Sequence, residues 1–170
     1  GNVIKVEDCK YNKIKAIKLF NNSVHYTKEQ NNKIFFRELQ ILNILYERFN
    51  KKKHEELFTL YYNETEFRNF NYIIFRLYHG NLYQERYKIR DSPISDKLII
   101  IKDLLKALIF LTSESPKIIH ADIKPENILF KSPDSFNIVL GDFGLSLILK
   151  DEYKNFKNII QTRWYRSPEI

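Results

Sequence analysis

The sequence predicts an α+β fold in two lobes: a small antiparallel β lobe with one long helix, then a larger, mainly helical lobe. Short β-branched and aromatic runs suited to strands fill the first part of the chain. One long segment among them repeats its apolar residues at helical spacing, and a strongly apolar helical segment follows Gly80. At 170 residues and 44% hydrophobic content, the chain can bury a core.

The first lobe is predicted to contain strands around one helix. Alternating and β-branched residues at Val3–Val6 and Lys13–Phe20 predict a hairpin. From Lys28 to Phe49 apolar residues recur every three or four positions, with charge on the other face, which predicts an amphipathic helix. Two aromatic-rich strands are expected around a polar turn: Leu57–Tyr62, the turn Asn63–Asn69, and Phe70–Tyr78.

The second lobe is predicted to follow a connector near Arg76–Gly80. A short helix is expected at Asn81–Ile89 and a strongly apolar helix at Asp96–Thr112. We therefore expect one lobe with the connector in residues 1–78 and the other in residues 79–170. Because the chain contains no methionine, we expect both lobes to be parts of a longer protein, with the fold truncated at both ends.

Composition limits the classes of partner. The formal charge is +7, but Lys, Asn, Ile, Tyr and Phe are abundant throughout, which indicates a compositional bias rather than a basic binding patch; we predict no direct nucleic-acid partner. Cys9 has no second cysteine to pair with, which suits a reducing compartment. The apolar run Leu98–Ile101 is far shorter than the ~20 residues of a membrane span, so no membrane partner is expected.

Three motifs follow one another in the second lobe. Asp122 and Asn127 stand five residues apart within the stretch His120–Leu129, and Asp142-Phe143-Gly144 begins fifteen residues after Asn127. Ser167-Pro168-Glu169 comes last. In this order and spacing, the motifs resemble the catalytic loop, the D-F-G motif and the A-P-E motif of eukaryotic protein kinases. The resemblance implies the two-lobed protein-kinase fold.

The resemblance also implies roles for these residues. Asp142 and Asn127 would hold Mg²⁺ on the phosphates of ATP, since oxygen ligands suit a hard cation. Asp122 would accept or orient the proton of the attacking hydroxyl. Lys124 would face the γ-phosphate, and a lysine there followed by Pro-Glu-Asn resembles the serine/threonine kinases.

The first lobe resembles the nucleotide-binding part of the same family. Lys13–Lys18 resembles the V-A-I-K strand, so Lys18 would reach the α- and β-phosphates. Glu38, beside the apolar stripe of the helix, would pair with Lys18; Glu29 and Glu47 are rival candidates that we expect to be solvated. By resemblance, further residues would bind the adenine or shape the substrate groove: Val6, Ala16 and Leu129 around the base, Phe75 behind it, Arg76 and Tyr78 through backbone groups, and Thr162 and Arg166 in the groove.

Two positions depart from the family pattern. The opening residues Gly1–Val6 align with the later half of the glycine-rich loop, which would put Ile4 at its last glycine, where a β-branched side chain would crowd the phosphates. Ala121 replaces the arginine that grips a phosphorylated activation segment in many relatives. We therefore expect the activation segment to be ordered without phosphorylation.

The end of the chain resembles one kinase group. Gln161–Glu169 is similar to the group that joins cyclin-dependent, MAP, glycogen-synthase and CDC-like kinases, and most similar there to the SR-protein kinases and the dual-specificity tyrosine-regulated kinases. The activating tyrosine of the latter family would fall at Ile159, which favours the SR-protein-kinase side.

The leading hypothesis is an ATP- and Mg²⁺-dependent protein serine/threonine kinase. The alternative is a pseudokinase scaffold that binds nucleotide weakly and regulates a partner. A kinase-like enzyme for small molecules is a third possibility, against which the groove segment Gln161–Glu169 argues. The expected partners are ATP and protein substrates, with Arg-Ser-rich proteins as a candidate, in the cytoplasm or nucleus. The sequence makes no prediction of the oligomeric state.

Overall fold

The computed structural model describes residues 2–20, 27–52, 56–67, 70–149, 162–166 and 168. Its contacts divide the chain into two compact units. The first comprises Gly1–Lys53 and Thr59–Leu77, and the second comprises His54–Phe58 and Tyr78–Ile170. Among the described residues, no helix is both long and apolar enough to cross a membrane.

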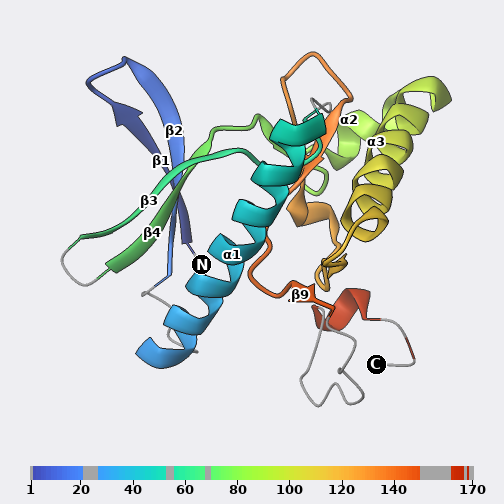
Figure 1. The fold of residues 1–170 in the computed structure, drawn as a ribbon. Helices are drawn as coiled ribbons and strands as arrows, with labels where there is room; N and C mark the ends of the chain where they lie inside the picture. The colour runs from blue at the N-terminus through green and yellow to red at the C-terminus, as the bar shows by residue number, and fades with distance from the viewer. Residues whose placement is uncertain are drawn as a thin grey trace. The chain divides into compact units, whose positions relative to one another are not determined.

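The first unit is an antiparallel sheet with one long helix (Figure 1). The strands lie in the order β1-β2-β4-β3, so that β2 and β4 are central. The helix contacts β4. The elements are β1 (Asn2–Asp8), β2 (Lys13–Leu19), α1 (Lys28–Lys52), β3 (Tyr61–Phe67) and β4 (Phe70–Arg76).

Helix α1 begins where the sequence pattern predicted and buries one stripe. At its start Thr27 and Gln30 form a capping box, each side chain accepting the backbone N–H of the other. Phe35 packs edge-to-face on Phe20 at 5.2 Å between ring centroids. Apart from the adjacent pair Ile41 and Leu42, the buried residues of the stripe follow one another at intervals of three or four positions: Asn31, Phe35, Glu38, Ile41, Leu42, Leu45 and Arg48.

The predicted strand Leu57–Tyr62 and turn Asn63–Asn69 are wrong in position. Strand β3 is Tyr61–Phe67 and runs through most of the expected turn. Polar residues are tolerated there because β3 is at the edge of the sheet. Leu57 and Phe58 are apolar for another reason, since both are buried in the second unit, where Phe58 bridges Leu140.

The second unit combines two helices with short strands. Strands β5, β7 and β8 form one sheet, and β6 and β9 form another. The predicted helix at Asn81–Ile89 begins later than expected, because Gly80–Asn81 pairs with β7. The elements are β5 (Gly80–Asn81), α2 (Arg86–Asp91), α3 (Ile94–Ser113), β6 (Ile118–Ile119), η1 (Pro125–Asn127), β7 (Ile128–Phe130), β8 (Ile138–Leu140), β9 (Leu147–Ile148) and η2 (Arg163–Tyr165).

The β7–β8 hairpin forms the centre of the second unit. It is antiparallel, and the Lys131 N–H donates to the Asn137 carbonyl at 3.0 Å, which closes the turn between the two strands. All three residues of β8 are fully buried. The strand leads directly into Asp142 and its neighbours, so the position of this buried strand determines where they start.

Two adjacent phenylalanines test the burial of α1. Phe35→Ala should lower the free energy of unfolding by about 3–5 kcal/mol, because it removes a buried ring and leaves a cavity. Phe36→Ala should cost less than about 1 kcal/mol, because that ring is 62% exposed. Urea unfolding of both variants measures the difference, and equal losses would contradict the observed face of the helix.

Candidate active site

Lys18 and Glu38 form a buried ion pair within the first unit. The Lys18 Nζ lies 2.6 Å from the Glu38 Oε2, and the two residues are 5% and 1% exposed. Lys18 is on β2, which has a strand on either side, and Glu38 is in the middle of the buried stripe of α1. The pair therefore holds the Lys18 ammonium group on the face of the sheet that packs against α1. Of the three predicted glutamates, Glu38 is the one that pairs with Lys18, while Glu29 is exposed and pairs with Lys33.

The β1–β2 register decides which residues share a face with Lys18. Val3 lies opposite Lys18, and Lys5 lies opposite Ala16. Directly opposed residues in antiparallel strands point to the same face, and neighbours along a strand point to opposite faces. Val6 therefore lies on the face away from Ala16 and Lys18. The register therefore does not support the prediction that Val6 encloses the base together with Ala16, because Val3 and not Val6 shares the face of Ala16.

The same register answers the expectation about Ile4. Ile4 lies opposite Ile17, on the face away from Lys18, within a regular strand. Val3 follows Gly1 by two residues, which matches the final G-x-V of the glycine-rich pattern. The predicted alignment was shifted, so Ile4 does not occupy the position of the last glycine. Gly1 itself lies outside the described residues.

Asp122 is the centre of a polar cluster in the second unit. Its Oδ1 accepts the backbone N–H of Thr162 at 3.1 Å and the Thr162 hydroxyl at 2.6 Å. Its Oδ2 lies 2.9 Å from the Lys124 Nζ and 3.1 Å from the Asn127 Nδ2. Lys124 also donates to the Thr162 hydroxyl oxygen at 2.8 Å. The structure thus brings together three predicted catalytic residues and one residue predicted only for the groove.

This cluster controls the ionisation of Asp122. Burial raises the pKa of Asp122, but hydrogen bonds from Thr162 and Lys124, with the positive charge of Lys124, lower it by more. The net pKa of Asp122 lies below its ordinary value of 3.8. The carboxylate is therefore ionised at neutral pH and can accept a hydrogen bond or a proton.

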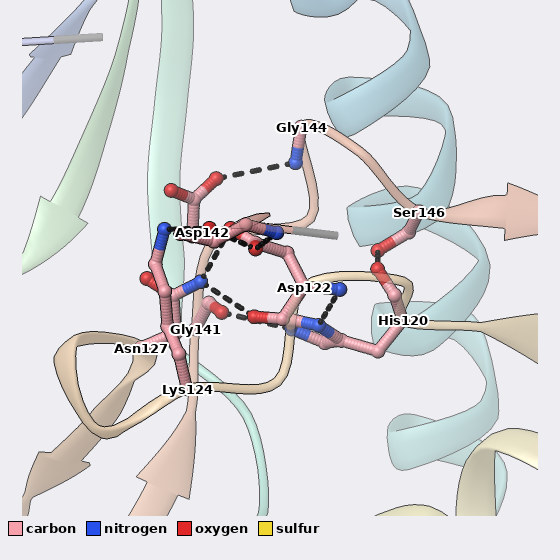
Figure 2. Close-up of polar contacts among 9 residues, drawn as sticks. His120, Asp122, Lys124, Asn127, Gly141, Asp142, Gly144 and Ser146 are labelled. Atoms are coloured by element: carbon pink, nitrogen blue, oxygen red, sulfur yellow. Dashed lines mark hydrogen bonds and ion pairs between the residues drawn. The ribbon is translucent and has the colours of Figure 1, made fainter. Parts of the chain in front are cut away.

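The side chain of Asn127 is oriented by Asp122. Its Nδ2 donates to both the backbone carbonyl and the Oδ2 of Asp122, at 2.8 and 3.1 Å (Figure 2). With the NH₂ group directed at Asp122, the amide oxygen is the atom available as a metal ligand. Asp142 supplies an exposed carboxylate whose Oδ1 accepts the Gly144 N–H at 3.3 Å.

These donors fit magnesium. Within the part of the chain that the structure describes, no group of three or more His, Cys, Asp or Glu side chains could hold a metal. Mg²⁺ does not need such a group, because it keeps waters and is held by one or two carboxylates together with substrate phosphates. A carboxylate at Asp142 and an amide oxygen at Asn127 match that requirement.

His120 connects the catalytic loop to the segment around Asp142. Its Nδ1 accepts the Asp122 N–H at 3.3 Å, so the ring proton is on Nε2, which donates to the Gly141 carbonyl at 2.9 Å. The His120 ring lies 4.9 Å from the ring of Phe143, edge-to-face. The buried Ser146 hydroxyl donates to the His120 carbonyl at 2.7 Å (Figure 2).

Sequence reasoning missed two of these contacts. Ser146 was not predicted, although a serine between Leu145 and Leu147 is a signal of a buried hydrogen bond. Thr162 was predicted for the groove, but its bond to Asp122 joins residues forty positions apart, and no local pattern reveals it.

Two site residues have unusual backbone angles. Ala121 has φ of 60° and Asp142 has φ of 61°, in the left-handed region that side chains other than glycine rarely adopt. Such conformations cost about 1–3 kcal/mol each and persist where the surroundings enforce them. The hydrogen bonds of the neighbouring residues Asp122 and Gly141 hold these conformations, so one strained residue directly precedes Asp122 and the other is Asp142 itself.

The other predicted site residues occupy both units. Phe75 is buried on β4 and lies opposite Ala16 in register. The N–H of Arg76 donates to the Leu60 carbonyl at 2.9 Å. The Tyr78 hydroxyl donates to the Glu56 carboxylate at 2.5 Å. Leu129 is half-buried on β7, and Arg166 is half-buried after η2.

Asp122 is thus held by Lys124, Asn127 and Thr162, and Asp142 follows it along the chain with a positive φ. The family model for the protein kinase domain matches residues 1–170. The chain therefore belongs to the protein kinase family, and its fold is the two-lobed α+β kinase fold.

Three relatives are dual-specificity kinases. The chain is 36% identical to "Dual specificity tyrosine-phosphorylation-regulated kinase 2" of Drosophila melanogaster, 30% to "Dual specificity protein kinase YAK1" of Saccharomyces cerevisiae, and 31% to "Dual specificity tyrosine-phosphorylation-regulated kinase 4" of Homo sapiens. All of the chain is covered, but only 22%, 20% and 31% of these relatives. The predicted kinase group and the likeness to dual-specificity kinases are confirmed. The likeness to SR-protein kinases stays a prediction, and Ile159 and Gln161 lie outside the described residues.

The Lys18–Glu38 pair predicts a specific pattern of stability. Lys18→Met should lower the free energy of unfolding by about 3–5 kcal/mol, because the Glu38 carboxylate stays buried without its lysine. The double variant Lys18→Met/Glu38→Leu should recover most of this loss. Urea unfolding of the two single variants and the double variant measures it, and strictly additive losses would show that the pair is not coupled.

The ionisation of Asp122 can be titrated directly. A lowered folded-state pKa means that Asp122 stabilises the protein above pH about 3.8 and that this stabilisation is lost as the pH falls through the lowered pKa. Thr162→Val should raise the pKa of Asp122 and shrink this contribution, whereas Thr162→Ser, which keeps a hydroxyl, should change it less. Carboxyl ¹³C NMR against pH measures the shift; an unchanged midpoint in Thr162→Val would refute it.

Proposed function

We propose that the chain is the catalytic part of an active protein kinase that transfers the γ-phosphate of ATP to serine or threonine hydroxyls. The observation that carries the proposal is the ionised, buried Asp122, held by Thr162, Lys124 and Asn127. A scaffold has no chemical need to hold a carboxylate in this way.

Asp122 and Lys124 perform the transfer in this proposal. Asp122 orients the substrate hydroxyl and takes its proton as the oxygen attacks the γ-phosphorus. The bond from that phosphorus to the β–γ bridging oxygen breaks, and ADP leaves with the electron pair. Lys124, 2.9 Å from Asp122, is close enough to place its charge against the transferring phosphoryl group.

Asp142 and Asn127 would hold Mg²⁺. When bound, the ion neutralises phosphate charge and orients the phosphates. Asp142 offers a carboxylate on an enforced left-handed turn, and Asn127 offers an amide oxygen oriented by Asp122. Both groups are held in position by the chain before any metal arrives.

Several residues of the chain would contact ATP. Lys18, fixed by Glu38, would contact the α- and β-phosphates. Val3 and Ala16, which share the face of Lys18, would contact the base, as would Leu129. Phe75 would lie behind the base, and backbone groups of Arg76 and Tyr78 would bond its edge.

The substrates of the whole protein are also a proposal. Thr162 and Arg166 would form part of the groove for the substrate peptide, with Arg-Ser-rich proteins as candidates. The relatives are named for dual specificity, so tyrosine is the competing acceptor. We propose an intracellular location, in the cytoplasm or the nucleus.

The pseudokinase alternative depended on Ile4 and on the truncation of the fold. A β-branched residue at the last glycine would crowd the phosphates, but the register puts Ile4 on the face away from Lys18. That argument against nucleotide binding is therefore removed, and the active kinase is the better supported function.

Phosphate transfer from labelled ATP with Mg²⁺ tests the proposal. Wild-type protein should label basic proteins and Arg-Ser-rich peptides on serine or threonine. Asp122→Asn should reduce the rate by about 10²–10⁴-fold, because it removes the proton acceptor. Asp91→Asn is the matched control, since Asp91 is an exposed aspartate paired with Arg90, and it should keep wild-type activity.

Two results would refute the proposal. A folded wild-type protein that transfers no phosphate would favour the scaffold. Labelling confined to tyrosine in a phosphoamino-acid analysis would refute the proposed acceptor but not the kinase activity.

A further inference from the structure

Asp103 is a buried carboxylate outside the site described above. It lies in α3 and is 2% exposed. Its Oδ2 accepts the backbone N–H of Ile138 at 3.2 Å and the side-chain amide of Asn137 at 3.1 Å. Its Oδ1 lies 3.8 Å from the Lys106 Nζ. A buried carboxylate is costly, so its partners matter to the fold around it.

The Ile138 N–H is on the outer edge of strand β8. The inner edge of β8 pairs with β7. On the outer edge, the Ile138 N–H goes to Asp103, and the Leu140 N–H goes to the Leu57 carbonyl at 2.9 Å. These residues are fully buried, and an unmatched N–H there would be expensive. Asp103 therefore supplies the acceptor at the first residue of the strand.

Strand β8 connects the residue bound by Asp103 to the segment that contains Asp142. The strand ends at Leu140, and the next N–H, that of Gly141, donates to the Asn127 carbonyl at 2.8 Å. Asp142 follows at once, in the left-handed conformation. The segment that presents Asp142 is thus held at its start by Asp103 and at its end by Asn127.

We propose that Asp103 is a positioning residue for Asp142, acting through β8, and that it tunes the affinity of the site for divalent metal with nucleotide. The inference rests on the proposed function for the role of Asp142. The anchoring itself is a property of the protein without metal, and it can be measured without any reaction.

The competing interpretation is that Asp103 only stabilises the second unit. The two interpretations differ in where a substitution acts. Loss of overall stability would affect all slowly exchanging amides alike, whereas loss of positioning would loosen residues 138–142 before the rest. Asp103→Leu removes the acceptor at similar size. Asp103→Asn keeps an oxygen for the Ile138 N–H.

Ala107→Gly is a matched control for stability. Ala107 is fully buried in the same helix, has no polar side-chain atom, and contributes no bond to β8. Glycine in a helix interior costs about as much as a lost hydrogen bond. It should therefore weaken α3 without changing the acceptor of the Ile138 N–H.

Amide hydrogen exchange of the complete protein without metal is the first measurement. Asp103→Leu should speed exchange at Ile138–Asp142 by about tenfold beyond any change elsewhere, the size expected when a buried hydrogen bond is lost. Asp103→Asn should stay within about twofold of wild type, the oxygen being retained. Uniform acceleration across α3 and β8, as in Ala107→Gly, would overturn the proposal.

The second measurement is the affinity for Mn²⁺ in the presence of a non-hydrolysable ATP analogue. Electron paramagnetic resonance detects the free and bound Mn²⁺. Asp103→Leu should weaken Mn²⁺ binding by about three- to tenfold. This loss is at the low end of what is seen when a residue that supports a metal ligand, without touching the metal, is substituted. Ala107→Gly should leave it unchanged. Unchanged affinity in Asp103→Leu would overturn the tuning role even where exchange is faster.

The two proposals fail in different ways. A wild-type protein that binds Mn²⁺ with nucleotide but transfers no phosphate would refute the kinase activity and leave the Asp103 measurement valid. A wild-type protein that binds neither Mn²⁺ nor nucleotide would overturn both the kinase activity and the role of Asp103 in metal affinity.

Discussion

Asp122 is the group on which the arrangement of the second unit depends. A buried carboxylate must be compensated by hydrogen bonds or positive charge, and Asp122 is compensated by Thr162, Lys124 and Asn127. Lys124 and Asn127 belong to the same loop as Asp122, whereas Thr162 lies forty positions further along the chain, so compensating one charge joins this loop to a distant segment. The same bonds turn the Asn127 amide so that its oxygen is available to a cation.

The same constraint operates in the first unit and in α3. Lys18 and Glu38 are both buried and are held at 2.6 Å, which fixes the cation proposed for the phosphates. Asp103 compensates a backbone N–H of β8 rather than a cation. In each case a buried polar group fixes the position of a neighbouring element more narrowly than apolar packing alone would do, because hydrogen bonds are directional.

Rigid support explains why the site can hold strained residues. Ala121 and Asp142 both have positive φ, and each lies next to a residue whose N–H is hydrogen-bonded, Asp122 to His120 and Gly141 to Asn127. The surrounding bonds offset the cost of these conformations, and Asp142 is presented on a turn that does not have to form when ligands bind.

The sequence by itself determined the family, the order of the motifs and the helix from Lys28, and it singled out Lys18, Asp122, Asn127 and Asp142 as candidates, because residue type and spacing along one chain carry that information. Tertiary structure decided which face of a strand each residue occupies, and therefore that Val3 rather than Val6 accompanies Ala16. It also moved the strand expected at Leu57 to Tyr61–Phe67 and joined Thr162 to Asp122. Strand register and contacts forty residues apart depend on pairing partners, which no local pattern specifies.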